Sequence, residues 1–566
     1  MGTNTDAASS PGLAMFEAHE ERLNQAVEAL ASRGYWAPYP EHTKNYPEEQ
    51  IQGAQAAFEA RLNSHFPLKG ATVIGQAGNE RSPYGFDLGI TYDQYDTNEL
   101  MDRQQAAMKS WRNAGVKTRV GLCLEAIQRL NAISGDMAQA VQHTSGQSNM
   151  MAFQAGGPHA QDRAVEAVAT AWKAMRDVPE SGEWHKPMGR RGTQSLSKRW
   201  HIVPRGISLA VACCTFPTWN TYPGLFASLV TGNPVLVKPH PGSILPLAMS
   251  VEIIQQVLEE AGFDPLLVAL VVDTPEQPLA KVLAEDTRVQ LIDFTGSSEF
   301  GNWLEQNATH AQVFTEKAGL NTVIIDSVDD IKAVTGNLGF SLSLYSGQMC
   351  TSPQAIYVPR TGIRAGDTHM SFDDVANAIK GAVQHWMADK DMACAFLGAI
   401  QSQRTNARID ACREQVEGRG TVLLDSEQLT HPEFPNALVR TPLLLSVDGK
   451  DVDLYGDEQF GPIAYIIATD STEHSMELAR QTIGEKGAIA LALYSTDEEV
   501  LDQGEELAQD VSVSLSVNLA GGFYMNQSAT FSDFHATGGN AAANTSFTDG
   551  AFVSRRFVVV QSRRPM

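Results

Sequence analysis

The heptapeptide Tyr345–Thr351, YSGQMCT, places one cysteine, Cys350, among small and polar residues. It follows a run with helical apolar spacing and precedes a short β-like segment at Ala355–Val358. Such a cysteine is either an inert part of the packing or a nucleophile that attacks a carbonyl carbon. Because the thiolate is the reactive form, the second role requires a base or an electropositive setting nearby. The cysteine alone does not decide between these roles.

Two other polar positions lie at the ends of predicted strands. Lys238 ends the apolar run Val235–Lys238, and Gly296 and Ser297 follow the run Leu291–Thr295. In open parallel sheets, ligands bind where strands end and helices begin. A helix that starts after a Gly-Ser turn also offers its free backbone amides to an anion. The alternatives are an ordinary tight turn for Gly296-Ser297 and a solvated strand end for Lys238.

The segments that would position these residues alternate between strand and helix. Strands are predicted at Ile207–Cys214, Val235–Lys238, Leu267–Val272 and Leu291–Thr295, and helices at Thr218–Val230, Pro246–Ala261 and Pro275–Ala284. This alternation predicts a parallel, doubly wound α/β sheet. A second βα pattern begins after Glu316 and leads into the cysteine loop.

Composition and charge limit the class of protein. A chain of 566 residues is too long for one ordinary core, so we expect two or three domains. The net charge of −24 argues against nucleic acid or an anionic membrane surface as a partner. The cysteines form no disulfide-like framework, and the N-terminus lacks the pattern of a secretory signal. We therefore expect a soluble protein in a reducing cytoplasm.

Ordered motifs along about residues 97–564 resemble those of the aldehyde dehydrogenase superfamily. GQMC, ending at Cys350, matches the family's GQ-x-C, and EKAGLN, beginning at Glu316, lies where the family has ELGGKN. The interval between Glu316 and Cys350 also agrees with the family. Three other motifs are similar in the same order: TGNPVLVKP to GN-x-VVLKP, FTGSSEFG to FTGSTEVG, and EQFGP to E-x-FGP.

The resemblance implies a covalent mechanism. Cys350 would attack an aldehyde, and the resulting thiohemiacetal would become a thioester as NAD or NADP is reduced. Glu316 would activate the water that hydrolyses the thioester. The alternative interpretation of Glu316 is a surface carboxylate at a strand edge.

The resemblance also implies cofactor-binding roles for five residues: Lys238 at the adenosine ribose, Gly296 and Ser297 at the pyrophosphate, Glu458 at the nicotinamide ribose, and Phe460 packed nearby. The alternative for Glu458 and Phe460 is a simple turn before a strand. We expect no metal site, because three histidines lack metal-ligand spacing and are predicted to be surface or loop residues: His201, His240 and His535.

One departure from the family concerns the oxyanion hole. The sequence CCTFP at residues 213–217 stands where the family usually has PWNFP, whose asparagine helps to stabilise the oxyanion. The ungapped register to Lys238 puts Thr215 at that position, whereas a shifted register would use Asn220. We prefer Thr215, and we expect its shorter side chain to leave more of the task to the Cys350 amide. Losing one such donor can cost about 2.7–4 kcal/mol.

A second departure concerns the cofactor. The position three residues past Lys238, often a glutamate in NAD-preferring members, is Pro241 here. A carboxylate there would accept a hydrogen bond from the 2′-hydroxyl of NAD and repel a 2′-phosphate. Its absence predicts that NADP is used at least as well as NAD, with a slight preference for NADP.

The chain looks more like the phenylacetic acid degradation (PaaN-type) branch than like general fatty or betaine aldehyde dehydrogenases. The features that carry this resemblance are the CTFP variant, the EKAGLN motif and the N-terminal extension. That resemblance implies a semialdehyde substrate, possibly linked to coenzyme A. One alternative is an acylating enzyme in which coenzyme A resolves the thioester, although retention of Glu316 favours water. Another is a catalytically silent, nucleotide-binding homologue.

The resemblance implies an α/β fold of the aldehyde dehydrogenase type. An N-terminal extension (1–95) would precede a Rossmann-type nucleotide-binding domain (96–317), a catalytic domain (318–535) and a C-terminal segment (536–566). A basic hairpin at about 186–204 matches, by position, the family's oligomerisation arm. With the β-rich tail, it predicts a homodimer or homotetramer.

Overall fold

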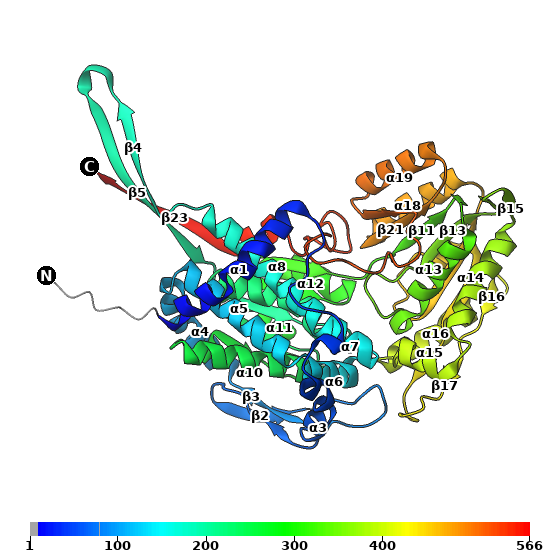
Figure 1. Ribbon diagram of the computed structural model, residues 1–566, viewed down its shortest axis with the longest axis horizontal. Helices are drawn as coiled ribbons and strands as arrows, with labels where there is room; N and C mark the ends of the chain where they lie inside the picture. Colours follow the sequence, from blue (N-terminus) through cyan, green and yellow to red (C-terminus); the bar gives the residue numbers. More distant parts are fainter. Residues whose placement is uncertain (1–9, 79) are drawn as a thin grey trace.

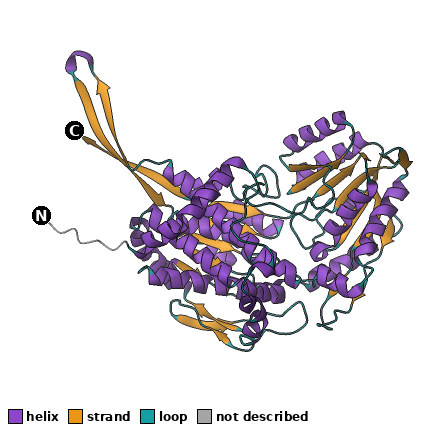
Figure 2. Ribbon diagram, viewed as in Figure 1, coloured by secondary structure: helices purple, strands orange, loops and turns teal. Residues whose placement is uncertain are grey.

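The computed structural model describes residues 10–78 and 80–566 of the chain. Two α/β bodies lie side by side, and a long β arm projects from the first (Figure 1). Figure 2 shows a sheet flanked by helices in each body. Among the described residues, no helix combines the length and apolar character needed to cross a membrane.

The first body is built on a five-stranded parallel sheet of order β10-β9-β6-β7-β8. Its strands are β6 (Ile207–Val211), β7 (Val235–Lys238), β8 (Val268–Leu270), β9 (Val289–Thr295) and β10 (Gln312–Glu316). The connecting helices are α9 (Pro217–Val230), α10 (Leu245–Glu260), α11 (Ala280–Glu285) and α12 (Ser298–Asn307). The strands are short and apolar because helices cover both faces of the sheet. The predicted doubly wound sheet is confirmed.

The order of these strands locates a binding edge. The chain runs outward from β6 through β7 to β8, and then returns to the other side of β6 with β9. Ligands of such sheets bind at this reversal, outside the carboxyl ends of the strands. Lys238, Gly296 and Glu316 all lie at the carboxyl ends, of β7, β9 and β10 respectively.

The second body carries a seven-stranded sheet of order β16-β19-β20-β13-β11-β21-β22, in which β16 alone runs antiparallel to its neighbour. Its strands are β11 (Thr322–Ile325), β13 (Ala355–Pro359), β16 (Thr421–Leu424), β19 (Leu443–Asp448), β20 (Ile463–Thr469), β21 (Ala490–Tyr494) and β22 (Ser514–Val517). Apolar clusters on its two faces include residues of α13 (Ile331–Ser343) and α14 (Phe372–Trp386) on one, and of α18 (Thr472–Lys486) and α19 (Glu498–Asp510) on the other. The chain passes between the two sheets just after Glu316.

The N-terminal extension is packed into the first body. Helix α1 (Pro11–Ser32) contacts α5 (Val116–Ala132) and α8 (Pro158–Arg176). The contact with α5 is close: a Cβ at Gly12 would lie 2.4 Å from Thr118. Residues 65–95 add a three-stranded sheet of order β1-β3-β2, with β1 at His65–Phe66, β2 at Val73–Ala77 and β3 at Thr91–Tyr95.

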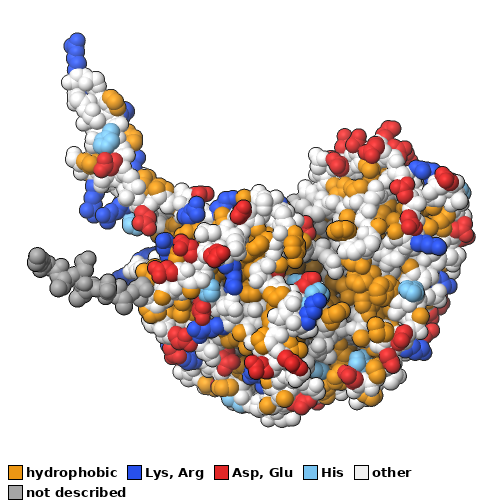
Figure 3. Space-filling view, in the orientation of Figure 1, with side chains coloured by type: hydrophobic (Ala, Val, Ile, Leu, Met, Phe, Trp, Pro, Cys, Tyr) orange, Lys and Arg blue, Asp and Glu red, His pale blue; other side chains and the backbone are white. Residues whose placement is uncertain are grey.

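The arm is made from two distant parts of the chain. Strands β4 (Ser181–Pro187) and β5 (Thr193–Pro204) form the predicted hairpin, and β23 (Phe557–Pro565) pairs antiparallel with β5. The predicted C-terminal strand therefore adds to the arm of its own chain. Figure 3 shows Lys and Arg side chains along this arm. The three valines Val558, Val559 and Val560 are exposed there.

Candidate active site

The loop that carries Cys350 has an unusual backbone. After α13, the residues Tyr345, Ser346 and Gly347 have φ angles of 52°, 50° and 61°. Side chains other than glycine rarely adopt this left-handed conformation, so the surrounding structure must impose it. A Cβ at Gly347 would lie 2.4 Å from the carbonyl oxygen of Gly461, which requires glycine. This left-handed stretch leads into Cys350, which lies in the loop between α13 and β13 and faces the first body.

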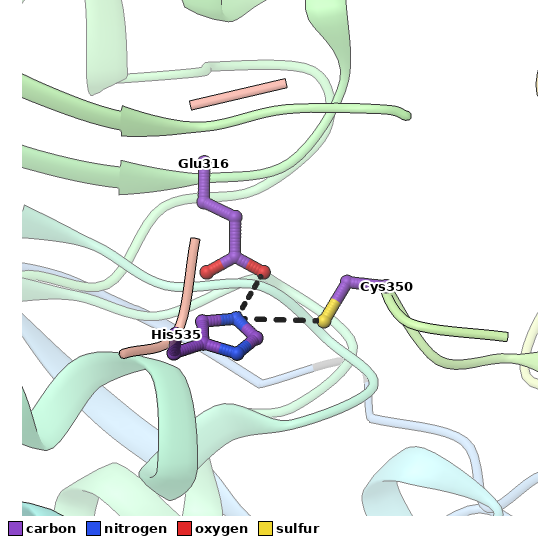
Figure 4. Close-up of side chains that lie close together, drawn as sticks. All are labelled: Glu316, Cys350 and His535. Atoms are coloured by element: carbon purple, nitrogen blue, oxygen red, sulfur yellow. Dashed lines mark hydrogen bonds and ion pairs between the residues drawn. The ribbon is translucent and has the colours of Figure 1, made fainter. Parts of the chain in front are cut away.

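Two side chains from distant segments, Glu316 and His535, lie beside Cys350 (Figure 4). Its Sγ lies 3.8 Å from Nε2 of His535, and that nitrogen lies 3.2 Å from Oε1 of Glu316. Glu316 ends β10, and His535 lies on the segment between β22 and the arm. The side chains of Glu316 and His535 are 1% and 3% exposed. The structure therefore brings together the predicted nucleophile and base, with a histidine between them.

His535 lies on a loop, as predicted, but it is buried and belongs to the site, which the sequence did not indicate. Its ring packs edge-on against Trp219, with ring centroids 4.8 Å apart, and the guanidinium of Arg163 lies over the Trp219 ring, 3.7 Å from its centroid. Oγ of Ser528 lies 3.4 Å from Nδ1 of His535. Because His535 follows Cys350 by 185 residues and lies on an irregular loop, no periodic pattern in the sequence marks it.

The three donor atoms of this cluster also lie within 4.8 Å of one another. A thiolate, an imidazole and a carboxylate at such separations are a ligand set that suits Zn²⁺. The expectation of no metal site considered only how histidines are spaced along the sequence. Such spacing does not reveal a cluster whose three residues come from distant segments.

The charge state of the cluster follows from its burial. Desolvation acts to raise the pKa of Glu316, but the charge and hydrogen bond of His535, with help from Cys350 and Arg163, outweigh it and leave that pKa lowered. Desolvation and then the Glu316 carboxylate raise the pKa of Cys350 well above its usual value. At neutral pH the resting site therefore holds a carboxylate and a protonated thiol, so the thiol proton must leave when the sulfur attacks.

Asn220 rather than Thr215 touches this cluster. Nδ2 of Asn220 donates a hydrogen bond of 3.1 Å to Oε2 of Glu316, from the first turn of α9. The backbone carbonyl of Thr215 accepts from Gln147 at 2.7 Å. Asn220 thus orients the carboxylate, and the oxyanion role of Thr215 stays a prediction.

The binding edge of the first sheet suits a dinucleotide. Ser297 caps α12 by accepting from the Phe300 amide at 3.4 Å. A Cβ at Gly296 would lie 2.7 Å from the ring of Phe294, so the turn requires glycine. A small cavity lies between α9 and the adjacent strands β6 and β9, and its lining includes Asn220 and Thr295.

The second body contributes Glu458 and Phe460 to the same region. Oε1 of Glu458 lies 3.5 Å from the amide of Gly319, just past Glu316. Desolvation raises the pKa of Glu458 to about 7, and the negative charge of Glu316 adds to the effect. The backbone carbonyl of Phe460 accepts from Arg408. Glu458 therefore lies near Glu316, and the nicotinamide-ribose roles of Glu458 and Phe460 stay predictions.

Lys238 has a partner that we did not expect. Its Nζ lies 2.7 Å from Oδ1 of Asp273. Asp273 directly follows the predicted strand Leu267–Val272, so the rule that selected Lys238 could also have selected it. The prediction of a slight NADP preference assumed that no carboxylate stands here, because position 241 is proline. Asp273 supplies one from the neighbouring strand, so that assumption is wrong.

Comparison with known proteins agrees with this geometry. The model of the aldehyde dehydrogenase family matches residues 90–551. The chain belongs to the aldehyde dehydrogenase family. The same conclusion follows from a crystal structure of an NAD-dependent aldehyde dehydrogenase from Burkholderia multivorans. That protein is 51% identical, with a TM-score of 0.96, and the match covers 98% of this chain and 99% of the other.

More distant aldehyde dehydrogenases are also similar. N-succinylglutamate 5-semialdehyde dehydrogenase of Paraburkholderia xenovorans is 26% identical over 412 residues, which are 71% of this chain and 77% of the relative. A 1-pyrroline-5-carboxylate dehydrogenase from Thermus, solved with bound NAD, has a TM-score of 0.73 at 16% identity over 94% of this chain and 99% of its own, which shows the shared fold. The protein is thus an aldehyde dehydrogenase that uses a nicotinamide cofactor to oxidise aldehydes.

Replacing His535 by glutamine should make activity more dependent on high pH. His535 lowers the pKa of the buried Glu316, and without it desolvation would raise that pKa. We expect the ratio of kcat/KM at pH 8 to that at pH 6 to rise about tenfold over the wild-type ratio. The exposed His201→Gln should leave the ratio unchanged. A variant that lost activity equally at both pH values would show that His535 is only structural.

Proposed function

We propose that this enzyme oxidises a semialdehyde, with or without a coenzyme A thioester at its far end, and releases the free acid. The observation that carries the proposal is Glu316 at the Cys350–His535 cluster, because hydrolytic release requires a base beside the thioester. The resemblance to the phenylacetic acid degradation branch supports a semialdehyde of aromatic degradation. The similarity to a relative described as a semialdehyde dehydrogenase supports the substrate class.

The first half-reaction forms the thioester. The Cys350 thiol gives its proton to Glu316 as the sulfur bonds to the aldehyde carbon, and the carbonyl oxygen becomes an oxyanion. The Cys350 amide and the Thr215 hydroxyl are the proposed donors to that oxygen. A bound NAD or NADP supplies the acceptor for the hydride that leaves the same carbon. Glu316 then passes its proton to bulk water.

The second half-reaction releases the acid. Glu316 takes a proton from water, the water oxygen bonds to the thioester carbon, and the carbon–sulfur bond breaks. The sulfur leaves as a thiolate and recovers a proton from Glu316. Asn220 holds the carboxylate in place throughout by its hydrogen bond to Oε2. Water and aldehyde are thus converted to an acid, with one reduced cofactor for each turnover.

Five residues would hold the cofactor along the binding edge: Lys238 at the adenosine ribose, Gly296 and Ser297 at the pyrophosphate, and Glu458 and Phe460 at the nicotinamide ribose. Their positions at strand ends and beside Glu316 support these roles. The hollow between the two bodies, with hydrophobic side chains gathered on its wall, offers space for an organic substrate (Figure 3).

A panel of aldehydes would test the substrate class. We expect semialdehydes, including coenzyme A-linked ones, to give a kcat/KM about tenfold or more above simple aldehydes of equal length, measured by cofactor reduction. Product analysis with and without free coenzyme A separates hydrolysis from acyl transfer: the free acid alone should form in both. Formation of an acyl-coenzyme A product would favour the acylating alternative, and no turnover with any aldehyde would favour a silent homologue.

We also propose a cytoplasmic homodimer or homotetramer assembled through the arm. The exposed valines of β23 and the outer edge of the three-stranded arm are surfaces that a second copy would cover. Light scattering on the eluting protein gives the number of copies, and a monomer would contradict the proposal.

A further inference from the structure

Lys238 and Asp273 form a buried ion pair at the binding edge of the first sheet. Lys238 ends β7, and Asp273 follows β8, the strand beside it. Nζ of Lys238 lies 2.7 Å from Oδ1 of Asp273, and the two side chains are 7% and 1% exposed. The other carboxylate oxygen, Oδ2, accepts a hydrogen bond of 2.9 Å from the Leu279 amide. Asp273 is thereby fixed at the position of the proposed adenosine ribose site.

The neighbouring His240 adds no positive charge to this pair. His240, two residues past Lys238, has its pKa lowered to about 4, first by desolvation and second by the Lys238 ammonium. It is therefore neutral at physiological pH. The other charged group that acts on it is Asp273. Lys238, Asp273 and His240 together carry no net charge, so these three residues offer no net positive charge to a phosphate dianion.

We propose that Asp273 makes this aldehyde dehydrogenase select NAD over NADP. Its carboxylate, supplied by the strand next to Lys238, takes the place of the acidic side chain that is missing at Pro241. It neutralises Lys238, so that the 2′-hydroxyl of NAD meets a pair without net charge, and it repels the 2′-phosphate of NADP. Because the pair is shielded from water, this repulsion is screened less than at the surface. The inference rests on the proposed ribose-binding role of Lys238.

Binding of two fragments to the full-length wild-type protein tests this without any aldehyde. Calorimetry should show that adenosine 5′-monophosphate binds at least tenfold more tightly than adenosine 2′,5′-bisphosphate. Equal binding, or tighter binding of the bisphosphate, would overturn the proposal. Since no substrate is present, failure of the proposed semialdehyde chemistry cannot produce either result.

Substitution of Asp273 then tests whether this residue causes the preference for the fragment without a 2′-phosphate. Asp273→Asn keeps an oxygen for the Leu279 amide but uncovers the charge of Lys238, so the ratio of the two fragment affinities should fall at least tenfold toward the bisphosphate. Glu276→Gln is the matched control, because Glu276 is an exposed carboxylate on the same loop, and its ratio should equal that of the wild type. An unchanged ratio in a folded Asp273→Asn would overturn the assignment. If that variant does not fold, Asp273→Glu should retain the preference, and the wild-type measurement still decides the selectivity.

Discussion

Replacing Cys350 by alanine should lower kcat for any aldehyde by about 10⁴-fold or more. The thioester route needs a sulfur that both attacks the carbonyl carbon and leaves it, and the methyl group of alanine does neither. The nearby Cys213, which lies 3.6 Å from Asn220, does not replace it, because its own contacts are with Phe216 and Asn220. Initial rates of cofactor reduction under saturating conditions measure the loss.

A matched control separates chemistry from packing. Cys123 is a buried cysteine on α5, and Cys123→Ala removes the same atom without touching the proposed site. It should keep nearly full activity per folded molecule. Cofactor binding by the Cys350→Ala protein should also persist, since the binding edge belongs to the other body. If Cys350→Ala turned over a short-chain aldehyde at the wild-type rate, the covalent mechanism would have to be abandoned.

Replacing Glu316 by glutamine should stop the enzyme after its first half-reaction. Glutamine can still accept from Asn220, but it cannot take a proton from the hydrolytic water, so steady-state turnover should fall by about 10²- to 10⁴-fold. The thiol also loses its base, so the first half-reaction should slow at neutral pH. Raising the pH increases the small fraction of Cys350 thiolate, so a burst of about one reduced cofactor per active site should form faster at pH 9 than at pH 7, while the steady rate stays low.

Rapid mixing at pH 7 and pH 9 shows both effects. Glu473→Gln, an exposed carboxylate on α18, is the control and should behave as the wild type at both pH values. A Glu316→Gln protein with a normal steady-state rate would mean that another group, with His535 as the nearest, activates the water.

The parts of the fold with regular periodicity were predictable from the sequence. Alternating apolar strands and helices predicted the parallel sheet, and the strand ends at Lys238 and Gly296 predicted its binding edge. The interval between Glu316 and Cys350 agrees with that of the family, and the two residues meet in the structure. Apolar periodicity and motif spacing can both be read from a single sequence, so these features could be predicted without the structure.

The residues that were missed lie on irregular segments or act across strands. His535 reaches the site through a loop without periodicity, and its contact with Cys350 spans 185 residues. Asp273 pairs with Lys238 only because β7 and β8 are neighbours in the sheet, an order that the sequence does not state. The left-handed backbone at Tyr345 and Ser346 was also invisible, because neither residue type favours it.

The most direct measurement is the mass of the trapped covalent intermediate. Glu316→Gln would be mixed with an oxidisable aldehyde and cofactor at pH 9, quenched with acid and digested. We predict that the acyl group is found on one peptide, at Cys350, in an amount near one per chain. An acyl group on Cys213 or Cys214, or none on any cysteine while the cofactor is reduced, would contradict the account.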